Sequence, residues 1–276
     1  MRMTTRDIRA KKKSGEKLVM VTAYDAPTAR IVDEAGVDMI LVGDSVGTNV
    51  LGLDSETLVT LDDVIHHARA VARSAANPLL VGDLPFMTFR VSTEQALAAS
   101  ARMIQEGRVQ AVKLEGGADV AAQVEAITTA GIPVMGHVGL TPQSVNELGG
   151  YRAQGRDSKG AKAVVNGALA LESAGAFAIV LESIPHRLAG SITERISVPT
   201  IGIGAGPYCD GQVQVIHDIA GWNPDFLPRH AKRFGNVAEE FRRAVAGYAE
   251  EVRGGSFPTE RHSFRISNSV MEEFED

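Results

Sequence analysis

Short apolar runs recur along the chain with helix-like segments between them. Seven of the runs have the length of strands, and an eighth, Gln212–Ile216, is weaker and is also compatible with a helix. The runs are continuous rather than alternating, which is typical of parallel strands covered on both faces. The seven clear runs are Leu18–Tyr24, Met39–Val42, Leu79–Val81, Ala111–Leu114, Pro133–His137, Phe177–Leu181 and Pro199–Ile203.

The segments between these runs predict helices with defined ends. Thr60 followed by Asp63 resembles a capping box, in which each side chain accepts a hydrogen bond from the other's backbone N–H. Glycines at 36, 107, 131 and 175 stand where a helix would stop before the next strand. The clearest predicted helices are Thr60–Ser74, Ser92–Glu106, Ala118–Ala130 and Ala161–Ala174.

Seven or eight such β/α units in one chain predict a closed (β/α)8 TIM barrel. A doubly wound open sheet is the alternative, and it is less favoured because no Gly-x-Gly-x-x-Gly follows the first run. Two segments break the repeat. Thr141–Gly160 is a long polar connection of the kind that forms functional loops, and after Trp222 the chain turns polar, then helical from about Asn236 to Arg253. We therefore expect one domain over residues 1–276, with a C-terminal helix and a partly mobile tail from about residue 254.

Composition narrows the class of protein. The chain has 276 residues and a net charge of −6, which argues against a nucleic-acid-binding surface. Cys209 is the only cysteine, so no intrachain disulfide can form and a reducing cytoplasm is the expected compartment. No apolar run is long enough to span a membrane. A basic start, Arg2 to Lys13, is followed by no signal-type apolar segment and is expected to be a solvated face.

Three apolar runs end on an acid. Val42-Gly43-Asp44 and Val81-Gly82-Asp83 share one ending, and the fourth run ends Lys113-Leu114-Glu115. Strand ends of a barrel meet at one mouth, so the acids should converge, where each close pair would repel by about 4 kcal/mol at an effective dielectric near 20. A divalent cation offsets such repulsion, and Mg²⁺ suits oxygen ligands. The alternative is that Asp44 and Asp83 cap the helices that follow.

Other polar residues at strand ends suggest roles around this cluster. Lys113 could bind a substrate carboxylate or pair with Glu115, and Ser45 offers a hydroxyl and a backbone N–H to an anion. Glu182, at the end of the sixth run, is the candidate general base, with a salt bridge to a neighbour such as Arg187 as the alternative. His137, after the fifth run, could bind substrate, move a proton or be structural.

Two further motifs carry weaker signals. His66 and His67 lie inside a predicted helix and are expected to be surface or packing residues. The segment Gly202-Ile203-Gly204-Ala205-Gly206 is compatible with a phosphate loop, but no lysine or helix start follows it. A tight turn that leaves room for substrate is the plainer interpretation.

With these residues in place, the chain closely resembles the 3-methyl-2-oxobutanoate (ketopantoate) hydroxymethyltransferase family. The matching stretches follow the family's order from near residue 20 to the 230s, with a weaker match at SFPTERHSF. They are TAYDAPTARIVDEAGVDMILVGDSVG, VGDLPFMTF, AVKLEGG, GIPVMGHVGLTPQSVNELGGYRAQGR, GAFAIVLESIP and PTIGIGAGPYCDGQVQVIHD.

The resemblance implies a barrel of the phosphoenolpyruvate/pyruvate superfamily and a step of pantothenate and coenzyme A biosynthesis. In that step 5,10-methylenetetrahydrofolate, water and 3-methyl-2-oxobutanoate give 2-dehydropantoate and tetrahydrofolate through a metal-stabilised enolate. The family's metal ligands fall on Asp44, Asp83 and Glu115, its substrate contacts on Asp44, Ser45, Asp83 and Lys113, and its proton acceptor on Glu182. Members form cytoplasmic homo-oligomers, commonly decamers.

Some positions depart from the family pattern, and alternatives remain. Arg108-Val109-Gln110, Ser183 and Leu227–His230 differ from the usual residues, but none falls on a carried-over ligand. A lyase or mutase of the same superfamily would use the same site, and a catalytically inactive barrel that binds metabolites or partners is a third possibility. Mn²⁺, Co²⁺ or Zn²⁺ could replace Mg²⁺. The folate pocket is not located, and Tyr151 and Arg152 in the Thr141–Gly160 loop are the residues to probe.

Overall fold

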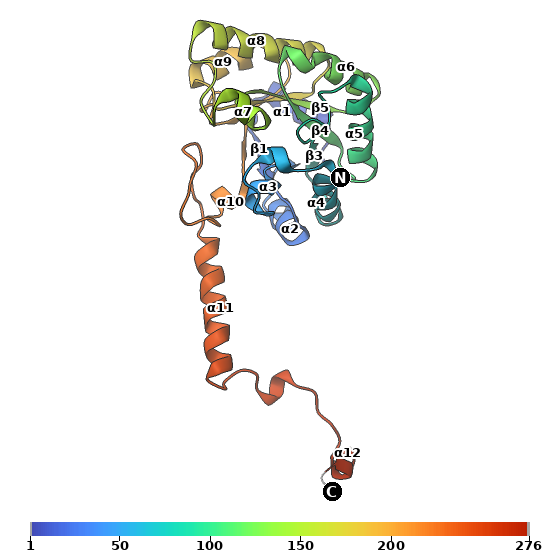
Figure 1. Cartoon of the computed structure of the whole chain (residues 1–276), viewed down its shortest axis with the longest axis vertical. Coiled ribbons are helices and arrows are strands. Elements are labelled where there is room, and N and C mark those ends of the chain that lie inside the picture. The colour runs from blue at the N-terminus through green and yellow to red at the C-terminus, as the bar shows by residue number, and fades with distance from the viewer. Residues whose placement is uncertain (1, 275–276) are drawn as a thin grey trace.

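Eight parallel strands close into a barrel in the order β1 to β8, with β8 pairing back to β1. The structure is a computed structural model, and it describes residues 2–274. Figure 1 shows the barrel with helices around it and a long arm leaving it toward the C-terminus. The strands are β1 (Leu18–Thr22), β2 (Met39–Val42), β3 (Leu79–Asp83), β4 (Ala111–Glu115), β5 (Val134–Gly139), β6 (Ala178–Glu182), β7 (Thr200–Ile203) and β8 (Gly211–Gln214). The predicted (β/α)8 fold is therefore confirmed.

One long helix follows each of the first six strands. These helices are α2 (Ala26–Glu34), α4 (Leu61–Ser74), α5 (Thr93–Gln105), α6 (Ala121–Thr129), α8 (Ser158–Ser173) and α9 (His186–Arg195). The Thr60–Asp63 capping box at α4 is present, with Thr60 N–H donating to Asp63 Oδ2 at 2.9 Å. Shorter helical turns lie between strand and helix: α3 (Val46–Asn49), η1 (Glu56–Leu58), η2 (Ala118–Val120), η3 (Pro142–Ser144) and α7 (Val145–Leu148).

The repeat fails after β6. The chain passes from β7 to β8 without a helix, and only the short α10 (Ile216–Ile219) stands between β8 and the C-terminal arm in the described chain. The weak run Gln212–Ile216, which was compatible with a strand or a helix, thus contains most of β8 and the first residue of α10. Because no long helix after β7 or β8 packs on the barrel in the described chain, the outward side chains Val19 on β1 and Gln212 on β8 are exposed.

Other boundaries differ for identifiable reasons. β1 ends at Thr22, two residues early, because Asp25 caps α2 by accepting from Thr28 N–H at 2.7 Å. The predicted loop Thr141–Gly160 is shorter than expected, since α8 begins at Ser158 with Asp157 as its cap. At the end of α5 the left-handed residue is Arg108, with φ 62°, rather than Gly107.

The apolar core has two layers separated by the sheet. One lies between strands and helices and contains residues such as Val42, Leu80 and Leu114. The other fills the barrel's interior with alternate strand residues, among them Met20 and Val81. Because side chains alternate along a strand, the next residue of β3 on the same inward face as Val81 is Asp83, which lies toward the mouth of the barrel.

The basic start forms α1 (Thr5–Ser14), which contributes the fully buried Ile8 to the interior cluster. Lys11 Nζ lies 2.6 Å from Asp38 and Lys12 Nζ lies 2.9 Å from Asp210. The expectation of a solvated face was therefore wrong for these lysines, because α1 packs on the barrel and they are paired there.

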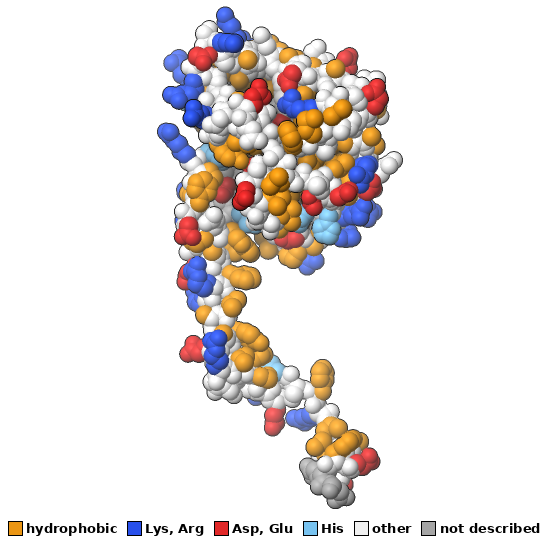
Figure 2. Space-filling model, viewed as in Figure 1, with side chains coloured by type: hydrophobic (Ala, Val, Ile, Leu, Met, Phe, Trp, Pro, Cys, Tyr) orange, Lys and Arg blue, Asp and Glu red, His pale blue; other side chains and the backbone are white. Residues whose placement is uncertain are grey.

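The C-terminal arm contains α11 (Val237–Arg253), η4 (Glu260–His262), α12 (Asn268–Met271) and η5 (Glu272–Phe274). No residue of α11 is buried. Its apolar side chains lie exposed along the arm, including Phe241 (61%) and Tyr248 (60%), as the orange atoms of Figure 2 show. Within the described residues, no helix combines the length and apolar character needed to cross a membrane.

Candidate active site

Three acids gather where β2, β3 and β4 end. Asp44 stands two residues beyond β2, while Asp83 and Glu115 are the last residues of β3 and β4. They are only 5%, 1% and 1% exposed. The parallel register pairs Asp83 with Lys113, so the charged groups of neighbouring strands lie at one level of the barrel. Neither Asp44 nor Asp83 caps a helix: the α3 N-terminus has no side-chain cap, and both carboxylates face other partners.

Lys113 is the cation that pairs with Asp83. Its Nζ donates to both carboxylate oxygens of Asp83 at 2.6 Å and lies 4.0 Å from Glu115 Oε1. Burial acts to lower the pKa of Lys113, but attraction from Asp83, Glu115 and Asp44 outweighs it and raises the pKa. Lys113 is therefore a buried ammonium ion whose main partner is Asp83, not Glu115.

The acids are not equally compensated. Burial raises the pKa of Asp44 well above its usual value, and repulsion from Asp83 and Glu115 adds to this. Burial also raises the pKa of Asp83, although Lys113 opposes it. For Glu115, burial is outweighed by His137, Lys113 and the N–H of Gln143, so its pKa is lowered. Asp44 is thus the acid whose negative charge the protein balances least.

His137, on β5, lies between two carboxylates. Its Nδ1 is 3.5 Å from Glu115 Oε1 and its Nε2 is 3.2 Å from Glu182 Oε2. These are ion-pair distances without aligned hydrogen bonds, since neither ring nitrogen has a hydrogen-bond partner in the described chain. Burial acts to lower the pKa of His137, but Glu115 and Glu182 raise it to about 9. The imidazole is therefore protonated at neutral pH.

Glu182 ends β6 and its side chain is 15% exposed. The alternative interpretation from the sequence was a salt bridge to a neighbour such as Arg187, whereas the structure places His137 beside the carboxylate, with Nε2 3.2 Å from Oε2. A glycine lets the backbones of β5 and β6 approach closely here, because a Cβ at Gly139, where φ is +101°, would collide with the Glu182 carbonyl oxygen. Glu182 thus reaches the mouth from the strand after His137.

Two residues that the sequence did not single out complete the cluster. The hydroxyl of buried Tyr24 lies 2.8 Å from Ser45 Oγ. Gln143, in η3 after β5, is 2% exposed and donates hydrogen bonds to both Asp44 and Glu115. The position of Tyr24 just beyond β1 was a visible signal, since other strand ends carried polar residues. Nothing in the polar loop distinguished Gln143 from its neighbours.

The remaining sequence candidates lie around this cluster. Exposed Tyr151 donates from its hydroxyl to Glu56 Oε2 at 2.6 Å, which links the loop after β5 to the loop after β2. Arg152 is exposed, and no contact of its side chain with the acids is present in the described chain. His67 Nδ1 contacts the Tyr24 carbonyl oxygen at 2.6 Å, a packing role. Gly204 and Gly206 have positive φ, as in a tight turn.

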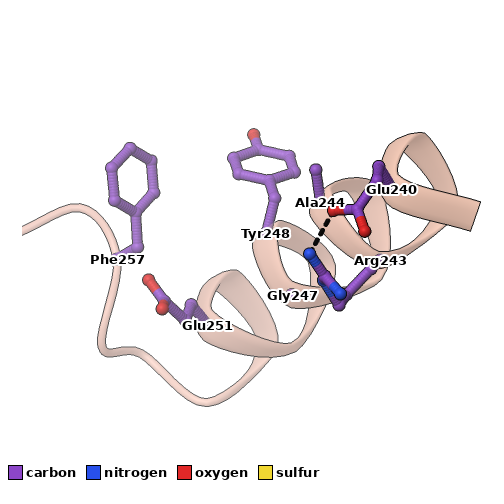
Figure 3. A pocket seen from close by; sticks show the side chains of 7 residues that line it. All are labelled: Glu240, Arg243, Ala244, Gly247, Tyr248, Glu251 and Phe257. Carbon is purple, nitrogen blue, oxygen red and sulfur yellow. Dashed lines mark hydrogen bonds and ion pairs between the residues drawn. The ribbon is translucent and has the colours of Figure 1, made fainter. Parts of the chain in front are cut away.

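A separate hollow of about 480 Å³ lies on the arm, where α11 meets the segment that carries Phe257. Figure 3 shows Tyr248 and Phe257 beside it, with Arg243 paired to Glu240. None of the residues from the barrel mouth lines it.

The chemistry of the three buried carboxylates fits a hard cation, because they offer oxygen ligands. The negative charge of Asp44 in particular is little balanced by neighbouring groups. Asp83 is turned toward Lys113 and Asp44 toward Gln143. Among residues 2–274, no three His, Cys, Asp or Glu side chains form a ready-made metal-binding group. Side-chain rotation would have to bring the carboxylates around one ion.

Solved structures of similar shape share this barrel at low sequence identity. Phosphonopyruvate hydrolase in complex with oxalate and Mg²⁺ matches with a TM-score of 0.60 and 16% identity, over 98% of this chain and 94% of that one. A 2,3-dimethylmalate lyase of the PEP mutase/isocitrate lyase superfamily matches with a TM-score of 0.58 and 15% identity, over 99% and 94%. The chain thus shares the barrel fold of these proteins.

Sequence comparison defines the family within that class. A model of the ketopantoate hydroxymethyltransferase family matches residues 2–260. A 3-methyl-2-oxobutanoate hydroxymethyltransferase of Dehalococcoides mccartyi (strain CBDB1) is 52% identical over 273 residues, covering 99% of this chain and 98% of that protein. One from Chloroflexus aurantiacus (strain ATCC 29366 / DSM 635 / J-10-fl) is 54% identical over 271 residues, covering 98% and 96%. The chain belongs to the ketopantoate hydroxymethyltransferase family.

Proposed function

We propose that this enzyme transfers a hydroxymethyl group from 5,10-methylenetetrahydrofolate to 3-methyl-2-oxobutanoate, giving 2-dehydropantoate for pantothenate and coenzyme A biosynthesis. The observation that carries the proposal is the buried cluster of acids around Lys113, with Glu182 and His137 beside it, in a chain that matches the family over residues 2–260. Such a cluster suits a small anionic oxo acid whose reaction develops negative charge.

Asp44, Asp83 and Glu115 are the residues that would hold Mg²⁺. The ion would supply Lewis acidity, which stabilises negative charge on the oxygens of a bound 2-oxo acid. Lys113 is held as an ammonium ion by Asp83 and would stabilise the same charge. Ser45, whose hydroxyl is held by Tyr24, would orient the substrate carboxylate. Mn²⁺, Co²⁺ or Zn²⁺ could serve the same oxygen ligands.

Glu182 is the proposed general base. Its carboxylate would take the proton from C3 of the oxo acid, and the resulting enolate carbon would form a bond to the methylene carbon of the folate. Both bonds from that carbon to the two folate nitrogens break and water supplies the hydroxyl oxygen. The proton taken from C3 and one proton of the water go to the two nitrogens, so that tetrahydrofolate leaves. His137, 3.2 Å from Glu182, would orient the carboxylate or bind substrate.

The Glu182→Gln variant tests this base. Exchange of the C3 hydrogen of 3-methyl-2-oxobutanoate in D2O with Mg²⁺, followed by NMR, is expected to slow about 10²- to 10⁴-fold. Glu172→Gln is the matched control, because Glu172 accepts from Ser197 N–H in another part of the chain and should leave exchange unchanged. Exchange by Glu182→Gln at the wild-type rate would remove Glu182 from the role.

The reaction itself is tested by mixing the enzyme with Mg²⁺, 3-methyl-2-oxobutanoate and methylenetetrahydrofolate and looking for 2-dehydropantoate. A lyase or mutase would instead cleave or rearrange an oxo acid without the folate, and an inactive barrel would do neither.

Variants of Tyr151 and Arg152 assayed at limiting folate would show whether the loop after β5 contributes to the folate site.

We also propose that the chain acts in the cytoplasm as a homo-oligomer, in line with its family. The exposed apolar side chains of the arm support this, because apolar side chains gathered on one helix without partners mark interaction surfaces. The decamer and the mobility of the tail beyond residue 254 remain predictions.

A further inference from the structure

Gln143 joins three strand ends of the barrel mouth through hydrogen bonds. Its backbone N–H donates to Glu115 Oε2 at 3.0 Å, and its side-chain Nε2 donates to Asp44 Oδ2 at 2.8 Å and to the carbonyl oxygen of Leu84 at 2.9 Å. The residue itself comes from η3, just after β5, and is buried. One loop residue therefore contacts groups at the ends of β2, β3 and β4.

The orientation of the Gln143 amide follows from its neighbours. Asp44 Oδ2 and Leu84 O are both acceptors, so only the NH2 end of the amide can face them. The other end, Oε1, is buried and has no hydrogen-bond partner within the described chain. A buried acceptor without a donor is costly, and it marks a place where a water or ligand is expected.

Asp44 depends on this contact more than the other acids do on theirs. Asp83 has the Lys113 ammonium and Glu115 has His137 nearby, whereas the Asp44 carboxylate receives one hydrogen bond among the described residues, from Gln143. An amide orients a carboxylate without adding positive charge. The hydrogen bond therefore holds one oxygen of Asp44 in place and leaves the other available to a cation.

We propose that Gln143 is a positioning residue for the Mg²⁺ site. It holds Asp44 and Glu115 by one oxygen each. This leaves Asp44 Oδ1 without a hydrogen bond among the described residues and available to the ion, whereas Glu115 Oε1 also faces His137 at 3.5 Å. The buried Oε1 of Gln143 would accept from a water that accompanies the ion. This rests on the proposed function, because it assumes that the carboxylates bind a divalent cation. Outer contacts of this kind typically change metal affinity 10- to 100-fold.

Gln143→Met tests the role, because methionine has a similar length and fills the space but cannot donate. The full-length variant is titrated with Mg²⁺ by calorimetry, and its fold is checked by circular dichroism. Mg²⁺ is expected to bind 10- to 100-fold more weakly than to the wild type. The backbone N–H to Glu115 remains in the variant, so the loss reports the side-chain contacts to Asp44 and Leu84.

Gln110→Met is the matched control. Gln110 is also a partly buried glutamine whose amide bonds to backbone, accepting from Leu80 N–H at 3.2 Å and donating to Arg108 O at 3.1 Å, but it lies before β4, at the opposite end of the barrel. This variant should melt at a lower temperature and bind Mg²⁺ within twofold of the wild type.

Each outcome decides the matter. A folded Gln143→Met that binds Mg²⁺ within twofold of the wild type would show that the glutamine only fills space, and the inference fails while the metal site stands. Wild-type enzyme that binds no Mg²⁺ would overturn the metal site together with the inference. If Gln143→Met does not fold, Gln143→Asn, which keeps the amide but is one methylene too short, replaces it with the same expected loss.

Discussion

At the scale of single residues, the pairing of Lys113 with Asp83 is what makes the buried charge of the mouth tolerable. Both side chains are at most 5% exposed, so each would be strongly destabilising without the other. Lys113 also attracts the neighbouring carboxylates of Asp44 and Glu115, but more weakly than that of Asp83. The site therefore combines Asp83, whose charge is neutralised by Lys113, with Asp44, whose charge is the least balanced of the three acids.

Lys113→Met is expected to lower the free energy of unfolding by about 3–5 kcal/mol at neutral pH, because it leaves Asp83 buried without its cation. Denaturant unfolding in the presence of a chelator measures the change. Adding Asp83→Asn to this variant should recover most of the loss, since the uncompensated charge is then removed. A single variant as stable as the wild type would mean that Asp83 finds water or another partner.

At the scale of elements, the turns at the opposite end of the barrel hold helices and strands in register. Asp33, in α2, accepts from Ala76 N–H at 2.6 Å and from Asn77 Nδ2 at 2.9 Å, which ties α2 to the turn before β3. Burial acts to raise the pKa of Asp33, but these hydrogen bonds outweigh it and the pKa is lowered. This link positions β3, and Asp83 with it.

Asp33→Ala should cost about 1–3 kcal/mol of stability at neutral pH, the range for hydrogen bonds to charged groups. Because the folded pKa is lowered, the contribution is complete above the ordinary aspartate pKa and is lost as the pH falls through the lowered value. Unfolding measured at several pH values should show the two proteins converging in acid. A difference that stays constant with pH would assign the effect to packing instead.

The elements also show where a local pattern was insufficient. Of the six helices that follow β1 to β6, the four predicted ones are α4, α5, α6 and α8, and each is marked in the sequence by a cap or a glycine stop, as in the Thr60 box of α4. The absence of a helix between β7 and β8 could not be predicted, since a glycine-rich turn is compatible with several kinds of connection. The loop after β5 was visible as a polar stretch, but not the turn η3 that carries Gln143 inward.

At the scale of the whole molecule, the arm is the part that the barrel does not explain. Its helix α11 carries exposed apolar residues at helical spacing, among them Phe241, Val245 and Tyr248. Figure 1 shows this helix pointing away from the barrel. Removing apolar side chains from water stabilises by about 25 cal/mol per Å², so an arm of this kind favours contact with another surface.

Phe241→Asp and Tyr248→Asp are expected to reduce the mass of the assembly measured by light scattering after gel filtration, from an oligomer toward the 29.3 kDa chain. The circular dichroism of the barrel should persist. Glu250→Lys, which changes an exposed polar position of the same helix, is the control and should leave the mass unchanged. A wild-type protein that already runs as a monomer would contradict the proposed oligomer.

The sequence by itself determined the barrel and the acids at its mouth. Apolar runs of strand length can be recognised locally, and Asp44, Asp83, Glu115 and Glu182 each stand directly at the end of one, where a parallel barrel gathers its side chains. The family could be recognised for the same reason, because its motifs surround these strand ends.

Only the tertiary structure decided which partner each charged group has. Lys113 pairs with Asp83 rather than Glu115, His137 stands between Glu115 and Glu182, and Gln143 reaches Asp44 across 99 positions of the chain. These contacts depend on distances between strands and loops far apart in sequence, and no local pattern encodes such distances. Charge compensation in the mouth is therefore a property of the closed barrel as a whole.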